Sequence, residues 1–536
     1  MSAPGKRVVA PAKPPRSVRK ATSARKPGPA TLPTPVRTPI SARMPVPKAH
    51  VILLVLILIL GAFLRFYGLT HHSIWWDEAG TIKLAHKSSV EIVRYLKIGD
   101  SPPLFYFLLD AWMKAFGSGE TAVRVLPAIL GFLLLPVLYW IGSALFGRRV
   151  GLLAAFVAAV GEFHVRYSQE VRMYTLLPLL GLLSLYMLYK AVLDDATRYW
   201  VAYAVLMTAT LYTHNYGVFI AASGAVFFVI TALRQKVSWK KFLVVQGLVG
   251  LAYLPWFLIV VGSQMGSPGI VGWIPRMRLS HVLSTFRSYS GLIFTVFRPA
   301  LNEFIVIAGG LVFFACFLAG VFSLKKRGKK RRRLPVPYVS NQAGLVLILC
   351  YLAVTLAVPM LISIRKPIFL SYRYSIAAWP AFVLIVGLGL AKLKRPTVLA
   401  AALALILAAS SVSLYWYQCV WVKAYDREIA AFIDSEAGPN DVIAYAPNTR
   451  ENPIKYYLRS PLKSVGFNSR GDTASETLTR IMAQLTDPAA KVFFFNEPSM
   501  TWIPHMQELE PLLESHFRRI EQRKYGTTVV TIYRLL

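Results

Sequence analysis

Long apolar runs recur from residue 50 to residue 415, and they limit the chain to a small set of folds. A helix of about 20 apolar residues crosses the hydrocarbon core of a membrane. Charged residues make up only 16% of the chain, against about a quarter in soluble proteins. The pattern excludes an ordinary soluble enzyme and predicts a polytopic α-helical membrane protein. We expect about eleven transmembrane helices, near 50–68, 122–146, 150–165, 172–190, 199–213, 216–233, 242–261, 301–323, 343–363, 374–391 and 397–415.

The net charge of +35 is concentrated beside these apolar runs. Residues 1–48 hold eleven Lys or Arg and no acid, and the run 325–333 adds eight more. Basic residues next to membrane helices mark the cytoplasmic side, and no aromatic-interleaved basic module indicates nucleic-acid binding. We therefore expect a multi-pass protein of the bacterial plasma (inner) membrane, with the N-terminus cytoplasmic and the C-terminus extracytoplasmic.

Composition divides the chain into three parts. Residues 1–48 are rich in proline and basic residues and are expected to form a disordered cytoplasmic tail. Residues 49–420 form the predicted transmembrane domain, with helices on the outer surface at about 69–121. Residues 421–536 alternate helical and strand patterns, which predicts a small α/β extracytoplasmic domain that acts as a lid or docking module. We expect its helices at 426–435, 473–485 and 505–516 and its strands at 441–446, 491–496 and 527–534.

The first candidate site is HHSIWWDEAG, which follows the first apolar run. Asp77 and Glu78 are adjacent carboxylates beside Trp76, at a predicted membrane interface. One of them could act as a general base on a substrate that lies partly in the membrane. The pair could equally be helix N-terminal acids next to an interfacial aromatic belt. A metal site that adds His71 and His72 matches no standard spacing.

Two further clusters lie at predicted outer ends of helices. In RYSQEVRMY, Glu170 could face Asp77 across a cavity while Arg166 or Arg172 meets an anion, and Tyr174 could contact substrate. Arg166 and Glu170 could also pair simply along one helix. In YTHNY, His214 is a possible substrate contact, although a single histidine is more often an interfacial residue.

A fourth cluster, IRKPIFLSYRY, places cations on the outer side, against the expected charge trend. Arg365, Lys366 and Arg373 suit a phosphate group because an arginine fork binds two oxygens at once. Some of them could instead be cations that snorkel toward lipid headgroups. Four arginines in the second long outer segment could contribute to the same anion site: Arg276, Arg278, Arg287 and Arg298.

Taken in order, HHSIWWDEA, SPPLFYFLLDAWMKAFG, RVLPAILG, RYSQEVRMY, YTHNYG and SYRYSIAAWPAF resemble the polytopic GT-C glycosyltransferases. The branch they resemble is the protein O-mannosyltransferase and aminoarabinose-transferase superfamily, which is glycosyltransferase family 39-like. The resemblance implies a GT-C-like fold and a polyprenyl-phosphate sugar donor used on the outer side of the membrane. It implies that Asp77 is catalytic and that Glu170 lies near the active site. The chain has Ser101 where the aminoarabinose branch has a lysine, which makes a lipid A acceptor doubtful.

The reaction implied is a single displacement that inverts the anomeric carbon. One carboxylate removes the acceptor proton, while arginines and a lysine, with a possible divalent cation, stabilise the departing phosphate. The acceptor could be a lipid, a glycan or a protein. Two other functions remain open: a transporter or flippase of lipid-linked sugars, and a non-catalytic envelope scaffold. Few charges lie in the middle of the apolar runs, which weighs against a transporter.

Overall fold

All eleven apolar runs are helical in the computed structural model of the protein, which describes residues 47–97, 101–264, 274–291, 300–325, 340–468, 471–497 and 506–536. Seven of these helices are long and apolar enough to cross a membrane. They are α1 (Lys48–Phe66), α5 (Glu120–Phe146), α8 (Leu176–Asp194), α11 (Trp239–Gln264), α13 (Ala300–Val321), α14 (Ser340–Ile362) and α16 (Pro396–Tyr415).

The remaining apolar runs give shorter or bent helices. The run near 150–165 becomes α6 (Arg148–Val160) and α7 (Glu162–Ser168), which meet at a bend of 63° and could form an eighth crossing. The others form α9 (Thr197–Leu211), α10 (Gly217–Ala232) and the pair η3 (Tyr374–Ala378) and α15 (Trp379–Leu390). Eleven crossings therefore stay a prediction, while the polytopic helical fold is confirmed.

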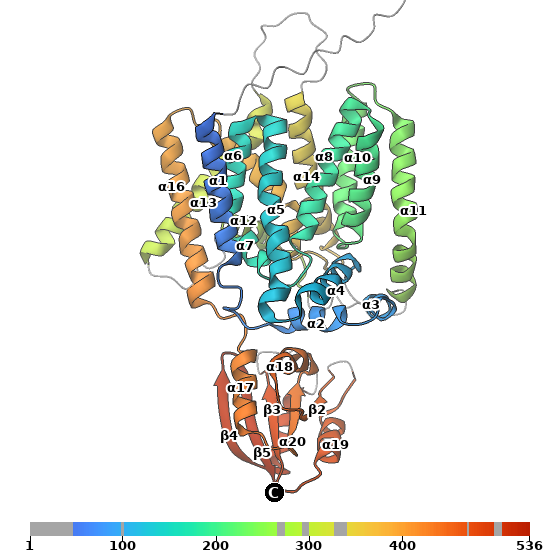
Figure 1. Cartoon of the computed structure of the whole chain (residues 1–536), viewed down its shortest axis with the longest axis vertical. Helices are drawn as coiled ribbons and strands as arrows, with labels where there is room; N and C mark the ends of the chain where they lie inside the picture. Colours follow the sequence, from blue (N-terminus) through green and yellow to red (C-terminus); the bar gives the residue numbers. More distant parts are fainter. Residues whose placement is uncertain are drawn as a thin grey trace, which may run out of the picture. The chain divides into compact units, whose positions relative to one another are not determined.

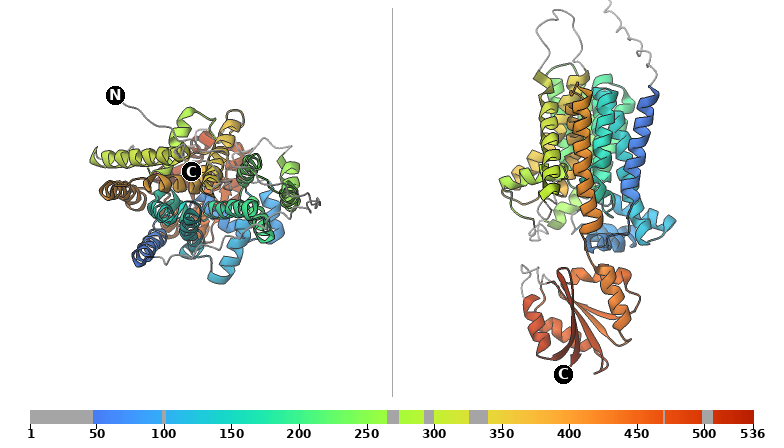
Figure 2. Two further views of the ribbon diagram at one scale, coloured as in Figure 1. Left: turned by 90° about the horizontal axis from the view of Figure 1, so that it is seen from above. Right: turned by 90° about the vertical axis from the view of Figure 1, so that its left-hand side faces the viewer.

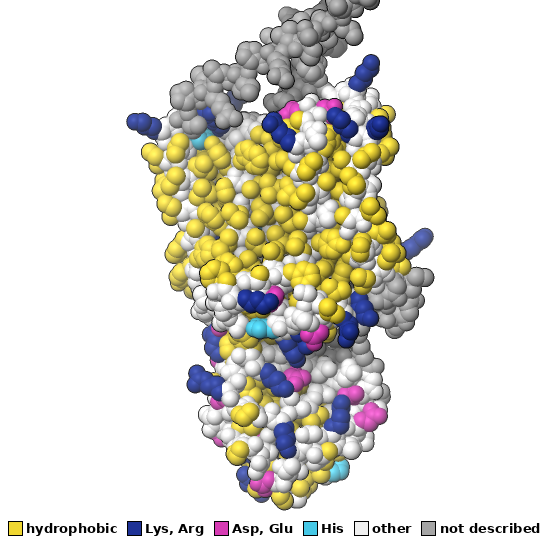
Figure 3. All heavy atoms as spheres, turned by 45° about the vertical axis from the view of Figure 1, so that its right-hand side comes forward, with side chains coloured by type: hydrophobic (Ala, Val, Ile, Leu, Met, Phe, Trp, Pro, Cys, Tyr) yellow, Lys and Arg dark blue, Asp and Glu magenta, His cyan; other side chains and the backbone are white. Residues whose placement is uncertain are grey.

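Helix α15 lies at the centre of the bundle, because all but one of its twelve residues are buried. It packs against α6 and α13 at glycines that let the helix backbones approach closely. A Cβ atom on Gly389 would collide with the carbonyl oxygen of Cys316 on α13. On the face that Figure 3 shows, a broad apolar band covers the bundle, with Lys and Arg side chains gathered at its margins. The protein is thus an integral, multi-pass membrane protein.

The segment at about 69–121, which is predicted to lie outside the membrane, contains three short helices: α2 (Trp76–Ala85), α3 (Ser89–Leu96) and α4 (Leu104–Phe116). They lie across one end of the bundle (Figure 1). The sequence predicts surface helices at about 69–121, and α2 begins beside Asp77 and Glu78, as the interpretation of these acids as helix N-terminal residues expects. A further short helix, α12 (Leu279–Tyr289), lies in the second outer segment. The predicted basic tail and the basic loop at 326–333 lie outside the described residues, as do Asp100 and Arg298.

After α16 the chain passes through a π-helical turn, η4 (Trp416–Val420), into a mixed five-stranded sheet of order β2-β1-β3-β5-β4. Strand β1 is parallel to β2 and β3, and β5 is antiparallel to β3 and β4. The elements are α17 (Asp426–Glu436), β1 (Val442–Ala446), η5 (Asn448–Arg450), α18 (Glu451–Tyr457), β2 (Lys463–Gly466), α19 (Ala474–Gln484), β3 (Lys491–Asn496), α20 (Met506–Glu514), β4 (Phe517–Tyr525) and β5 (Thr528–Leu535).

Helices cover both faces of this sheet (Figure 2). Helices α19 and α20 pack on one face, and α17 and α18 pack on the other. Strand β1 is buried along its whole length because both of its faces are covered. The α/β prediction is confirmed, although the sequence gives no signal for α18, β2 and β4. The boundary between the transmembrane domain and the C-terminal domain at residue 421 stays a prediction.

The sheet domain contacts the bundle through its α17 and α18 side. The Tyr457 hydroxyl accepts a hydrogen bond of 2.7 Å from the backbone of Ile74, just before α2. Arg427 on α17 binds Glu120, the first residue of α5, at 2.8 Å. Short α2 is therefore held between the membrane helices and the C-terminal domain.

Candidate functional site

The first turn of α2 carries two carboxylates whose side chains go to different partners. Asp77 and Glu78 are acids at a helix N-terminus, where the helix dipole stabilises negative charge. Asp77 reaches Arg373, while Glu78 reaches Arg124 on α5. The adjacent acids therefore perform different tasks.

Asp77 forms an ion pair with Arg373 across 296 residues of sequence. The Arg373 Nη1 atom lies 3.0 Å from Asp77 Oδ2, and the two side chains are only 14% and 12% exposed. The guanidinium also lies 5.3 Å from the ring centre of Trp75 and 6.0 Å from that of Tyr174. This pair joins a candidate base to a candidate phosphate-binding cation.

Glu78 is completely buried and is held by four groups, one of which is the Trp75 backbone N–H at 3.4 Å. Arg124 binds both of its oxygens, at 3.0 and 2.8 Å, and the Val171 backbone donates to it at 3.1 Å. Lys423 lies 3.3 Å away. Burial alone would raise the pKa of this carboxyl, but the charges of Arg124 and Lys423 outweigh it and lower the pKa to about 2.

Glu78 is therefore a fixed anion that fastens the first outer loop. Arg124 extends this anchoring, because it also donates to the backbone carbonyls of Leu69 and His72 at 2.6 and 2.7 Å. The arrangement supports an anchoring role for Glu78. Its assignment as a catalytic residue stays a prediction.

Lys423 forms an ion pair with Glu170 beside the Trp75 ring. The Lys423 ammonium lies 3.0 Å from Glu170 Oε2 and 4.6 Å from the centre of the Trp75 ring. The other Glu170 oxygen is buried and has no hydrogen-bond partner among the described residues. Lys423 lies between η4 and α17, so the segment that leads into the C-terminal domain supplies a cation to the site.

The predicted cluster around Arg172 lies beside Asp77. Arg172 donates to Thr81 on α2 at 3.0 Å, and its guanidinium lies 5.7 Å from the ring centre of Tyr174. The Tyr174 hydroxyl is buried without a hydrogen-bond partner in the described part of the chain, and burial raises its pKa. Tyr174 is thus a donor available to a ligand.

His214 and Trp76 occupy the edges of this region. The His214 ring centre lies 6.3 Å from that of Tyr174. Burial, with the charge of Arg172, lowers the His214 pKa to about 3, so this histidine is neutral at physiological pH. Trp76 is 41% exposed and packs edge-on against Trp75. Both positions stay possible substrate contacts.

The structure does not connect Arg365 and Lys366 to Arg373. Both lie exposed in the turn after α14, and no described contact links them to the Asp77 pair. Arg276 and Arg278 are likewise exposed, before and at the start of α12. Among the predicted cations that the structure describes, Arg373 pairs with Asp77, and Arg172 lies close to it. Arg166 lies close to Glu170, with its guanidinium 5.2 Å from the ring centre of Trp421.

The metal site considered for His71, His72, Asp77 and Glu78 is not formed by these side chains. Among the described residues, no three His, Cys, Asp or Glu side chains gather to hold a metal ion. His72 contacts the Tyr417 carbonyl at 3.0 Å, and Glu78 is already bound by Arg124.

Sequence reasoning does not identify two residues of the site, Arg124 and Lys423, whereas Trp75 belongs to the HHSIWWDEAG motif. Arg124 lies in the RVLPAILG segment, where a single arginine near a helix start gives no signal of its partner. Lys423 is a cation just past the last apolar run, on the side where basic residues are unexpected. That departure from the charge trend is the one signal that could have identified it.

Comparisons with known proteins agree with this architecture. Residues 100–259, less than half of the chain, match the family of dolichyl-phosphate-mannose-protein mannosyltransferases. No curated protein sequence gives a significant match. The crystal structure of ArnT from Cupriavidus metallidurans bound to undecaprenyl phosphate is similar, with a TM-score of 0.56, 14% identity, and coverage of 91% of this chain and 98% of that one.

A second similar structure is the archaeal oligosaccharyltransferase AglB from Archaeoglobus fulgidus, in complex with an inhibitory peptide and a dolichol-phosphate. Its TM-score is 0.52 at 13% identity, with coverage of 90% of this chain and 74% of that one. At such identities the likeness concerns the fold. The chain has the fold of the polytopic GT-C glycosyltransferases, as its sequence resemblance predicts.

Proposed function

We propose that this protein transfers a sugar from a polyprenyl-phosphate donor to an acceptor hydroxyl on the outer face of the membrane. Two similar structures contain a polyprenyl-type lipid phosphate, undecaprenyl phosphate in ArnT and dolichol-phosphate in AglB. The observation that carries the proposal is the Asp77–Arg373 pair, which places a carboxylate and a phosphate-binding cation 3.0 Å apart beside the membrane helices.

In the proposed reaction, Asp77 is the general base. Arg373 holds its Oδ2 atom, and Oδ1 accepts the proton of the acceptor hydroxyl. The acceptor oxygen then attacks the anomeric carbon, and the bond from that carbon to the phosphate oxygen breaks. The polyprenyl phosphate leaves as an anion, and the configuration of the anomeric carbon inverts.

Arg373 and Arg172 are the proposed phosphate partners. Phosphate is a good leaving group when its developing charge is met by positioned cations. Arg373 can turn part of its fork to the phosphate, because guanidinium groups bind several oxygens at once. Glu78 and Glu170 support these groups: Glu78 fastens the loop through Arg124, and Glu170 holds Lys423 against Trp75.

Single-turnover transfer by the purified full-length protein tests this assignment. With a labelled polyprenyl-phosphate sugar and an envelope extract as acceptor, Asp77→Asn should lose about 10²–10⁴-fold in rate. Donor binding should change little, because the amide keeps the size of the carboxylate. Asp110→Asn is a matched control, since Asp110 lies on nearby α4 and pairs with the surface Lys114.

Near-normal turnover in Asp77→Asn would exclude Asp77 as the base and move the assignment to Glu170. Reconstituted vesicles discriminate the transporter alternative: a transporter would move labelled lipid across the bilayer without transferring its sugar.

A further inference from the structure

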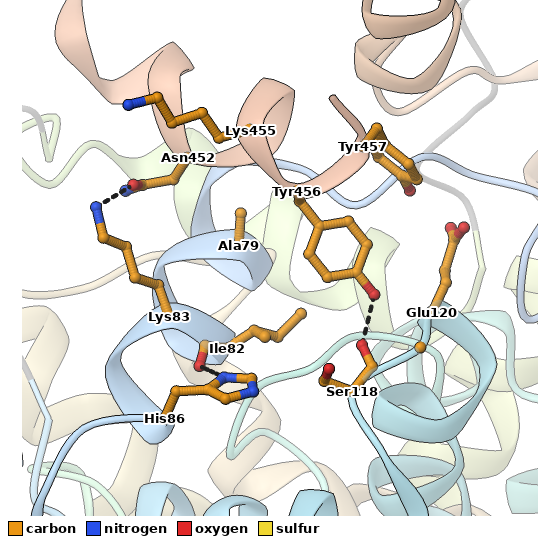
Figure 4. A pocket seen from close by; sticks show the side chains of 11 residues that line it. Ala79, Ile82, Lys83, His86, Ser118, Glu120, Asn452, Lys455, Tyr456 and Tyr457 are labelled. Atoms are coloured by element: carbon orange, nitrogen blue, oxygen red, sulfur yellow. Dashed lines mark hydrogen bonds between the residues drawn. The ribbon is translucent and has the colours of Figure 1, made fainter. Parts of the chain in front are cut away.

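A pocket of about 610 Å³ lies between α2, the turn from α4 to α5, and α18 (Figure 4). This volume is within the usual range for ligand sites, and such sites often form between domains. One wall belongs to the membrane part and the other to the C-terminal domain. Tyr456 projects from α18 across the pocket, and its hydroxyl donates to the Ser118 carbonyl at 2.8 Å.

The pocket is separate from the Asp77 site. Helix α2 contributes Ala79, Ile82 and Lys83 to it, and His86, the residue that directly follows α2, also lines it. At about 100° per residue, these four positions lie on the side of α2 opposite Asp77. Thr81, which binds Arg172, lies on the same side as Asp77. One helix therefore carries the proposed base on one face and a pocket wall on the other.

The lining combines aromatic and polar groups in a way that suits a carbohydrate. Tyr456 and Tyr457 supply ring surface for the C–H faces of a sugar. Asn452 and Lys83, which lie 2.9 Å apart across the opening, supply an amide and an ammonium for sugar hydroxyls. The lining acid, Glu120, is already bound by Arg124 and Arg427. Of the two lining lysines, Lys455 pairs with Glu451 at 2.6 Å, whereas Lys83 binds the neutral Asn452. The charge that remains is the positive charge of Lys83, which is compatible with neutral and acidic sugars.

A peptide fits this lining less well. Extended peptides bind commonly by adding a strand to a free sheet edge. The residues of the pocket come from two helices and a turn, so they offer no strand edge. A lipid tail would need an apolar lining, whereas two lysines line this opening.

We infer that the pocket between α2 and α18 is a saccharide-binding subsite, which holds a non-reacting part of a glycan acceptor while another part reaches Asp77 around α2. The inference rests on the proposed function and specifies its acceptor. A helix is about 10–12 Å across with its side chains, so only an acceptor of several sugars can occupy both positions.

A residue that fills the pocket tests the inference. Gly119 lines the pocket, and a Cβ added there meets no atom within 4 Å, so Gly119→Trp should fold normally. Gly471→Trp is the matched control, because Gly471 is exposed on the C-terminal domain and its Cβ is equally unobstructed. Unchanged unfolding temperatures for both variants would verify folding.

The assay uses the labelled polyprenyl-phosphate donor and envelope glycan that has been cut into long and short fragments. For long fragments, Gly119→Trp should raise the acceptor KM about tenfold or more, with kcat and the donor KM unchanged. Short fragments should show no difference between this variant and the wild type. Lys83→Met and Asn452→Ala should raise the KM for long fragments about threefold to tenfold, as expected for one lost hydrogen bond.

An unchanged KM for long fragments in Gly119→Trp would overturn the inference and leave the proposed function standing. If the labelled sugar were found only on proteins and not on glycan fragments, the inference would also be overturned, because the acceptor would then be a peptide. Direct binding of the long fragments to the full-length protein gives a readout independent of turnover. Binding that Gly119→Trp abolishes, in a protein that transfers no sugar, would retain the pocket and reject the proposed transfer.

Discussion

At the scale of single residues, the site is a set of charges that neighbours neutralise pairwise. Asp77 pairs with Arg373, Glu78 with Arg124, and Glu170 with Lys423. Charge buried in this way is tolerated only when each ion has its partner. A phosphate can bind Arg373 by replacing part of its pair with Asp77, whereas Arg172 binds the neutral Thr81 and can meet a phosphate directly.

Arg373 is expected to be the main contact to the donor phosphate. Losing a charged hydrogen bond costs about 1.5–3 kcal/mol, so Arg373→Ala should weaken donor binding at least tenfold. Arg373→Lys should recover only part of the affinity, because lysine lacks the fork. Arg365→Ala, in the exposed turn, should change binding less than threefold. An equal loss in both alanine variants, measured by equilibrium binding of the labelled donor, would return the phosphate site to that turn.

Glu78 is expected to act on stability and on its pH dependence. Glu78→Gln leaves Arg124 and Lys423 without their shared anion, which should cost about 3–5 kcal/mol. The folded pKa, about 2, lies below the ordinary value of 4.5. The stabilisation is therefore complete at neutral pH and is lost as the pH falls from about 5 toward 2.

Thermal unfolding in detergent at several pH values measures both effects. Between pH 7 and pH 3 the wild type should approach the unfolding temperature of Glu78→Gln. Equal stability of the two proteins at pH 7 would contradict the anchoring role. Asp110→Asn serves as the control, because that carboxylate pairs at the surface.

At the scale of elements, the bundle depends on close contacts between helix backbones. Gly389 lets α15 approach α13 so closely that a methyl group would meet the Cys316 carbonyl. Gly389→Ala must push two helices apart, and overpacking of this kind costs about 1–3 kcal/mol or more. We expect a lower unfolding temperature and less folded protein in the membrane.

Gly250→Ala on α11 is the matched control. A Cβ there meets nothing within 4 Å, so the better helix propensity of alanine should leave stability unchanged or slightly higher. Size-exclusion profiles and unfolding temperatures of the two variants make the comparison. Equal behaviour would mean that α13 and α15 are not tightly packed.

At the scale of the whole molecule, the topology decides where the reaction takes place. The basic segments on the predicted inner side favour an outer C-terminus. A reporter that is active only in the cytoplasm should therefore give no signal when it is fused after Leu536. The same reporter inserted after Gln235, in a predicted inner loop, should give a strong one. A strong signal from Leu536 would place the Asp77 site on the cytoplasmic side.

The sequence by itself determined the class of the protein. Long apolar runs partition into a membrane, where a helix satisfies all of its own backbone hydrogen bonds. It also determined the strands 441–446 and 491–496, whose apolar runs match β1 and β3. Local residue patterns were sufficient for these features. A helix that begins at Asp77 and Glu78 was one of two interpretations of that motif, but the position of α2 depends on contacts with α18, which no local pattern reports.

Only the tertiary structure decided which charges meet. Asp77 and Arg373 are 296 residues apart, and Lys423 reaches Glu170 across 253. Spacing along the chain carries no information about such pairs, because they depend on how whole helices pack. The same packing gives the neighbours Asp77 and Glu78 different ion-pair partners, and it leaves Arg365 in an exposed turn. It also forms the pocket between α2 and α18, to which both helices contribute.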